Sequence, residues 1–494
     1  MNSTRLARGA TWNLLGQLVP LGAALVCIPP LVAHLGADRF GVVTLAWALV
    51  GYFTLFDFGI GPAVTRTLAR CRAEGRESEA AGWFWTAIAL TLGLGIVGAI
   101  AVAAAAPWLT HSLLRVPPAL QGETLGILSL LALSLPFVTV SAAAGGALAA
   151  YQRFGALNAV RIPLGALTFL APLAVALYTT NLAAVGAALA LTRFFGAAAN
   201  LALCVRLLPG VGRRMVVRRD AVGPLLGFGG WMTVSAVVGP FMVYFDRFLI
   251  GSLLSLAMVA YYTTPYDLAT RVWILSQAIV GVLFPAMTGD FVRDPASVRR
   301  LFAWGVRLVA TLVFPITFVL VLFAPEGMTA WLGATFAEHG APVLRWVAAG
   351  VFLNCLAQIA LAVVQASGRP RWSATLHTIE LPFYLAVLVL LVRWHGIEGA
   401  AQAWFLRVVV DTVALFVLAR RRVEGGDAAA IATLVGAAAL AAMGVGAAIA
   451  SPGARALYGA GVLVAFVWAG YRWVYLPGKP VFEALLSRRV AEGT

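Results

Sequence analysis

The placement of apolar residues gives the chain its strongest structural signal. Apolar runs of about 20 residues recur from Trp12 onward, and a helix of that length crosses about 30 Å of hydrocarbon. Because a backbone in hydrocarbon must pair its own amides, such runs predict helices. We therefore expect an all-α polytopic membrane protein. About fourteen transmembrane helices are predicted, near residues 11–35, 40–60, 82–106, 122–149, 157–179, 182–205, 224–249, 258–287, 303–323, 341–366, 374–393, 399–419, 429–450 and 456–476.

Composition and charge agree with this pattern. The 494 residues are 61% hydrophobic and 11% charged, whereas soluble domains are about 25% charged. The net charge of +15 comes from arginines clustered between the spans, which points to membrane topology and not to nucleic acid. With a cytoplasmic amino terminus, about 24 basic residues fall on the inside and about 4 on the outside. Both termini are thus predicted to be cytoplasmic.

The chain also contains a predicted internal repeat. A shift of about 219 residues superposes similar segments, such as 148–163 on 363–382. Six spans per repeat bring both halves into the membrane from the same side, related by an axis along the membrane normal, with a cavity between two lobes. The expected divisions are an N-terminal six-helix lobe, a C-terminal six-helix lobe and two additional helices with a cytoplasmic tail, at residues 1–208, 209–422 and 423–494.

Two pairs of charges interrupt the apolar segment after residue 237. Asp246 and Arg247 are adjacent, so they point about 100° apart on a helix. One interpretation is that Arg247 reaches the lipid headgroups while Asp246 caps or pairs locally. Asp267 and Arg271 are four residues apart and are predicted to touch, facing the cavity between the lobes.

Other polar residues extend this candidate cavity lining. Asp57 precedes Gly59, Gly61 and Pro62, which predict a broken helix before Arg66. An ordinary cytoplasmic helix end with positive-inside arginines is the alternative. Further cationic and amide side chains are candidates for the lining, although amides also join helices to one another: Arg161, Arg193, Arg407, Asn13, Asn158 and Gln358.

Sequence signals for an enzyme are weak. The stretch GLGIVG at 93–98 lies within an apolar run without a preceding strand, so we interpret it as close helix packing. No Walker A motif or HExxH spacing occurs, and no cofactor or metal is expected. Glu380 near His377 predicts either a proton relay or packing, and packing is favoured.

Four stretches resemble a known transporter family: RGATWNLLGQ, LFDFGIGPAVTR, YQRFGALN and YFDRFLIGSLLSLAMVAYYTTPYDLATR. They are similar to the polysaccharide transporter branch of the multidrug/oligosaccharidyl-lipid/polysaccharide exporter superfamily. The resemblance covers roughly the first twelve predicted spans. Its signature residues are Asp246, Arg247 and Tyr261.

The resemblance implies a flippase with two rocking six-helix lobes in the bacterial inner membrane. Its substrate would be an undecaprenyl-pyrophosphate-linked oligosaccharide for O-antigen (lipopolysaccharide), capsule or exopolysaccharide synthesis, and transport would be coupled to an ion gradient. A polymerase and glycosyltransferases of the same pathway are implied partners. The cavity candidates for substrate binding are then Arg66, Arg161, Arg193, Arg271, Arg407, Asn13, Asn158 and Gln358. The ion-coupling candidates are Asp57, Asp267 and Glu380.

The sequence leaves three alternatives open. A multidrug exporter would need an acidic, aromatic pocket, which the excess of arginine over acids within spans disfavours. A glycan polymerase or ligase usually carries a large periplasmic loop, whereas the longest outside segments here, near 107–121 and 324–340, have about 15 residues. A peptidoglycan-precursor flippase has the same fold and is poorly separated by sequence.

Overall fold

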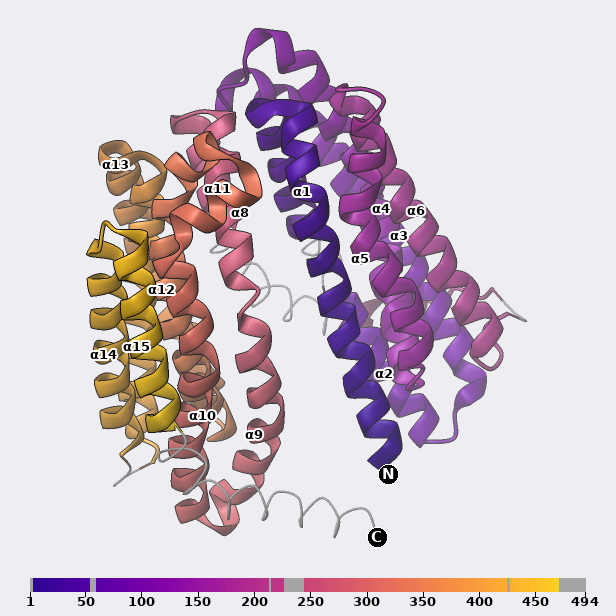
Figure 1. Ribbon diagram of the computed structural model, residues 1–494. Coiled ribbons are helices and arrows are strands. Elements are labelled where there is room, and N and C mark those ends of the chain that lie inside the picture. Colours follow the sequence, from indigo (N-terminus) through magenta and orange to yellow (C-terminus); the bar gives the residue numbers. More distant parts are fainter. Residues whose placement is uncertain (1–2, 54–58, 213–214, 226–243, 424–426, 471–494) are drawn as a thin grey trace. The chain divides into compact units, whose positions relative to one another are not determined.

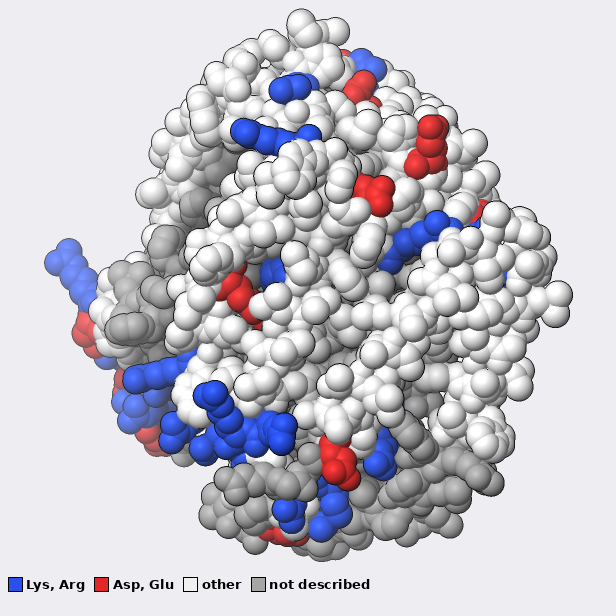
Figure 2. Space-filling view, turned by 90° about the vertical axis from the view of Figure 1, so that its left-hand side faces the viewer, with Lys and Arg blue, Asp and Glu red and all other residues white. Residues whose placement is uncertain are grey.

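The computed structural model describes residues 3–53, 59–212, 215–225, 244–423 and 427–470, and side chains from residue 16 onward except 292–293, 295 and 370. Within these residues the fold is helical and contains no strand, which confirms the all-α prediction (Figure 1). On the face shown in Figure 2 most described side chains are uncharged, and Lys and Arg gather mainly near its lower end.

The described residues form a series of helical elements. In chain order they are α1 (Ser3–Phe53), α2 (Ile60–Ala73), α3 (Glu77–Trp108), the π-helical turn η2 (Leu109–Leu113), α4 (Pro118–Ala150), α5 (Phe154–Ala176), α6 (Leu182–Leu207), α8 (Leu256–Thr270), α9 (Trp273–Arg293), α10 (Pro295–Leu322), α11 (Ala324–Leu332), α12 (Ala334–Ala366), α13 (Pro370–Arg420), α14 (Ala428–Ala448) and α15 (Pro452–Gly470).

Eleven described segments are long and apolar enough to cross a membrane, as a polytopic fold requires. Two of them lie in α1 and α13, which have 51 residues each. At 1.5 Å per residue such a helix would be about 76 Å long, more than twice the hydrocarbon thickness. Each therefore bends at a glycine with positive φ, Gly36 (φ 74°) in α1 and Gly396 (φ 60°) in α13. Both long helices thus cover two predicted spans, and the total of about fourteen stays a prediction.

The chain forms two compact units, residues 1–260 and 261–494. In the first, α4 is central and packs against α2, α3 and α6, with Ala143, Ala144 and Ala147 fully buried at the contact. In the second, α12 is central and packs against α9, α10 and α13. A shift of about 219 residues carries α4 to within three residues of α12, in line with the predicted repeat. The predicted divisions after residues 208 and 422 stay predictions.

The last two helices pack on α10 in the second unit. Arg455, at the start of α15, is 5% exposed. Its guanidinium donates to the backbone oxygens of Leu322, Ile449 and Ala450 at 2.9–3.1 Å and to the Glu326 carboxylate at 3.1 Å. Because the last carbonyls of a helix lack partners within it, one arginine here satisfies the ends of both α10 and α14.

Close packing of α3 on α4 depends on a glycine in the GLGIVG stretch. A Cβ on Gly95 would lie 2.6 Å from the Cα of Pro136 and 2.5 Å from Oγ1 of Thr139, whereas a Cβ on Gly93 would meet nothing within 4 Å. Thr139 also donates its hydroxyl to the Thr91 carbonyl at 2.8 Å. The interpretation of this stretch as a packing motif is therefore correct for Gly95.

The matched pair Gly95→Ala and Gly93→Ala tests this contact. We expect Gly95→Ala to push the α4 backbone away and to lower the free energy of unfolding by about 1–3 kcal/mol. Gly93→Ala should be neutral or slightly stabilising, because alanine is the better helix former. Thermal unfolding of both purified proteins in detergent measures the difference. Equal melting temperatures would contradict the packing role of Gly95.

Candidate functional site

Three titratable side chains meet inside the second unit. Ligand-type atoms of His377, Glu380 and Asp411 all lie within 4.8 Å of one another. His377 and Glu380 precede the Gly396 bend of α13 and Asp411 follows it, so the bend brings them together. We call His377, Glu380 and Asp411 the α13 acid cluster.

Burial makes the α13 acid cluster unusual. Glu380 is 7% exposed and Asp411 is 3% exposed. His377 Nε2 lies 3.3 Å from Asp411 Oδ1, and the imidazole is about one-third exposed. Neither oxygen of Glu380 has a hydrogen-bond partner within the described part of the chain. A carboxylate in this setting loses its hydration without gaining a donor, which strongly disfavours its charged form.

One cation lies beside the two acids. The Arg407 guanidinium is 5.6 Å from the centre of the Tyr384 ring. Arg407, Asp411 and His377 all interact electrostatically with Glu380. When the imidazole is counted as neutral, the two carboxylates and one guanidinium leave one negative charge, which a single proton or monovalent cation neutralises. The imidazole and carboxylates also suit a metal ion, but a divalent ion would leave an excess positive charge beside Arg407.

The sequence indicates only part of this site. It points to Glu380, His377 and Arg407 as candidates, but not to Asp411 or Tyr384. The signal for Asp411 was present, since it is an acid within the apolar run VVVDTVALFVL. An acid in such a run is expensive and therefore a candidate functional group.

The pair Asp246–Arg247 is buried in the first unit, at 1% and 3% exposed. Asp246 Oδ1 accepts a hydrogen bond from the backbone N–H of Arg247 at 2.8 Å, and the guanidinium lies 5.0 Å from the centre of the Tyr244 ring. Tyr244 in turn contacts Tyr52, with the ring centres 5.5 Å apart. The interpretation that Arg247 reaches the lipid headgroups is therefore wrong, whereas local pairing of Asp246 is correct.

The region that follows departs from the expected regular helix. α8 ends at Thr270, and a turn at Arg271 and Val272 separates it from α9. Arg271 directly follows the last residue of α8, and its contact with Asp267 stays a prediction. Tyr261, the third signature residue, is buried and stacks on His339, with ring centres 4.8 Å apart and planes at 19°.

The remaining cavity candidates occupy different environments. Arg66 and Arg161 are exposed, and Gln358 is half-buried in α12. Arg193 is half-buried and donates to Thr168 Oγ1 at 3.4 Å. Their assignment to a substrate cavity stays a prediction.

Two amide candidates and one acid complete the set. Asn158 is buried and donates to the Phe154 carbonyl of its own helix at 3.0 Å, which is a structural bond. The Asn13 side chain and the whole of Asp57 lie outside the described residues.

Comparison with known proteins relates this geometry to a family. The model of the polysaccharide biosynthesis protein family matches residues 6–289, more than half of the chain. The chain belongs to this family. A protein of Shigella flexneri assigned as an O-antigen transporter is 26% identical over 410 residues, which cover 83% of this chain and 96% of that protein. A protein of Haloferax volcanii assigned as a flippase of low-salt glycan biosynthesis is 26% identical over 190 residues, 38% of this chain and 40% of that protein.

Solved structures show the fold of this polysaccharide biosynthesis protein. An inward-facing multidrug resistance MATE family transporter of the MOP superfamily has a TM-score of 0.70 at 15% identity and covers 83% of this chain and 98% of that chain. The lipid II flippase MurJ in an inward closed conformation has a TM-score of 0.70 at 11% identity, covering 94% and 99%. The family resemblance and the prediction of a transporter in place of an enzyme are confirmed.

Charge balance in the α13 acid cluster can be tested with paired variants. Arg407→Gln removes the nearby cation and should lower the free energy of unfolding by about 2–3 kcal/mol, because two buried carboxylates are left uncompensated. The double variant Arg407→Gln, Asp411→Asn keeps the original net charge and should recover much of that loss. Denaturation in detergent measures both. If the double variant lost as much free energy of unfolding as the two single variants combined, the two residues would not compensate each other's charge.

Proposed function

We propose that this family member is a flippase that moves an undecaprenyl-pyrophosphate-linked oligosaccharide across the bacterial inner membrane. The glycan would serve O-antigen, capsule or exopolysaccharide synthesis, and both termini would lie in the cytoplasm. The match that spans 96% of the relative assigned as an O-antigen transporter carries this proposal. A polymerase and glycosyltransferases of the same pathway are the proposed partners.

Ion coupling belongs to the same proposal and is placed at the α13 acid cluster. Glu380 takes up one proton, which neutralises the net charge of the cluster and Arg407 together, and the partly exposed His377 passes that proton to and from water. Release of the proton restores a buried negative charge, which costs free energy in a dry environment. Protonation thus shifts the equilibrium between two conformations of the second unit. Coupling of transport to a proton gradient requires such a shift.

Substrate binding in the proposal depends on arginines, because a guanidinium keeps its charge and binds a diphosphate through two parallel hydrogen bonds. Arg271 is the first choice, since it lies at the turn between α8 and α9, where the backbone departs from regular helix. Irregular backbone within a membrane protein is tolerated where it meets protein or a wet cavity.

Mass spectrometry of lipid extracts from cells with and without the gene tests the function. We expect deletion to accumulate undecaprenyl-pyrophosphate oligosaccharides, because their glycan cannot reach the outer face. Wild type should reverse the accumulation, and so should Arg206→Ala, which changes an exposed arginine at the end of α6. Arg271→Ala should not. Unchanged lipids together with altered sensitivity to cationic dyes would instead indicate a drug exporter, and accumulation of peptidoglycan precursor a lipid II flippase.

A further inference from the structure

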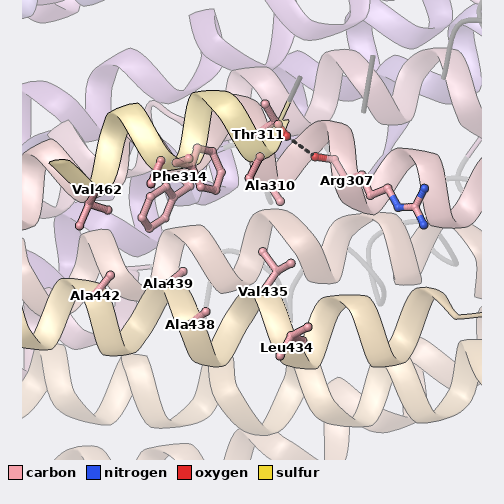
Figure 3. A pocket seen from close by; sticks show the side chains of 14 residues that line it. Arg307, Ala310, Thr311, Phe314, Leu434, Val435, Ala438, Ala439, Ala442 and Val462 are labelled. Atoms are coloured by element: carbon pink, nitrogen blue, oxygen red, sulfur yellow. Dashed lines mark hydrogen bonds between the residues drawn. The ribbon is translucent and has the colours of Figure 1, made fainter. Parts of the chain in front are cut away.

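A groove in the second unit lies apart from the α13 acid cluster. It is formed by α10, α14 and α15 and has a volume of about 410 Å³ (Figure 3). Its walls are apolar apart from Thr311 and Arg307, and Arg307 lies at one end. Small side chains of α14 and α15 leave the space open, namely Ala438, Ala439, Ala442, Ala465, Ala469 and Gly470.

An apolar groove of this kind needs an occupant. Empty space deprives its lining of dispersion contacts, and water gains little from apolar walls. A methylene group has roughly the volume of a water molecule, about 30 Å³, so the groove holds about a dozen methylenes. That capacity fits one acyl chain of an ordinary phospholipid. It is too small for most of a long polyisoprenoid.

Arg307 indicates the charge of the occupant. The side chain is half-buried, and its Nε has no hydrogen-bond acceptor within the described residues. The hydrogen bond drawn in Figure 3 joins the Thr311 hydroxyl to the Arg307 carbonyl at 2.8 Å and leaves the guanidinium available. A charge in a membrane helix without a partner costs about 2.5–3.5 kcal/mol on insertion scales. Phosphate, the anionic group of a phospholipid, is a partner whose geometry a guanidinium fork matches.

The depth of Arg307 also suits a phospholipid. It lies seven residues after Arg300, about 10 Å further along α10. With the cytoplasmic orientation proposed above, a guanidinium at this depth extends toward the inner headgroup layer. Basic pockets between membrane helices on the cytoplasmic side bind anionic lipid headgroups.

We propose that this groove binds one acyl chain of an anionic phospholipid from the inner leaflet, with the lipid phosphate on Arg307. The bound lipid fills the space between α10 and the pair α14–α15. The apolar walls alone do not select a lipid, since lipid tails are as apolar as the walls, so the selection comes from the phosphate contact. This site is separate from substrate translocation and does not depend on the chemistry of the glycan.

Native mass spectrometry of the purified full-length chain tests the proposal with two probes of identical acyl chains. We expect one phosphatidylglycerol to be retained per protein at least tenfold more strongly than phosphatidylcholine. Arg307→Gln should reduce this preference to about twofold or less, whereas Arg307→Lys should keep most of it. Arg206→Gln, which removes an exposed arginine outside the groove, should leave it unchanged. Ala442→Leu, which fills the groove, should weaken retention of both lipids.

Several results would overturn the proposal. Equal retention of the two lipids by wild type would show that the groove does not select the phospholipid headgroup. An unchanged preference in Arg307→Gln would show that Arg307 does not bind the lipid phosphate. A polyprenyl diphosphate that displaces phosphatidylglycerol from wild type and is itself lost from Arg307→Gln would assign the groove to the transported lipid. Melting temperatures measured for each variant distinguish lost binding from lost folding. Because these readouts involve no transport, they are independent of the proposed flippase activity.

Discussion

The cost of an uncompensated charge in a dry, apolar surrounding is the constraint on which the organisation of this protein depends. Apolar helices form readily, but every buried charge needs a partner. Arg455 meets this requirement with three carbonyls and one carboxylate at the ends of α10 and α14. Arg247 lies against Tyr244 in the first unit. The α13 acid cluster differs, because Glu380 lacks a hydrogen-bond donor in the described structure.

In the proposed mechanism, that difference separates structural charges from functional ones. A buried charge whose partners are all present stabilises one arrangement of the helices, and its protonation state does not need to change. With the imidazole counted as neutral, the α13 acid cluster and Arg407 together have one negative charge in excess, so a bound proton changes their most stable state. In the proposed mechanism, such a carboxylate beside a partly exposed imidazole is a two-state element whose equilibrium a proton gradient shifts. The Gly396 bend creates it by folding α13 back on itself.

The sequence predicts the helical fold well, because apolar runs in hydrocarbon have few structural options. It also identifies the GLGIVG stretch at 93–98 as a packing motif and Glu380 and Arg407 as candidates. It does not predict the burial of Arg247, since that depends on Tyr244 and Tyr52 from distant segments. Nor does it pair Glu380 with Asp411, because their contact depends on how the two arms of α13 are rotated about their axes. Helix rotation comes from tertiary packing.

Reconstituted transport tests the central claim most directly. Purified wild type, Glu380→Gln and the exposed-acid control Glu338→Gln would be placed in liposomes with a lipid-linked oligosaccharide, and the translocation rate measured with and without an imposed proton gradient. If protons are coupled at Glu380, the gradient should raise the translocation rate of wild type and Glu338→Gln severalfold. The translocation rate of Glu380→Gln should be the same with and without the gradient. An equal response of all three proteins to the gradient would contradict the account.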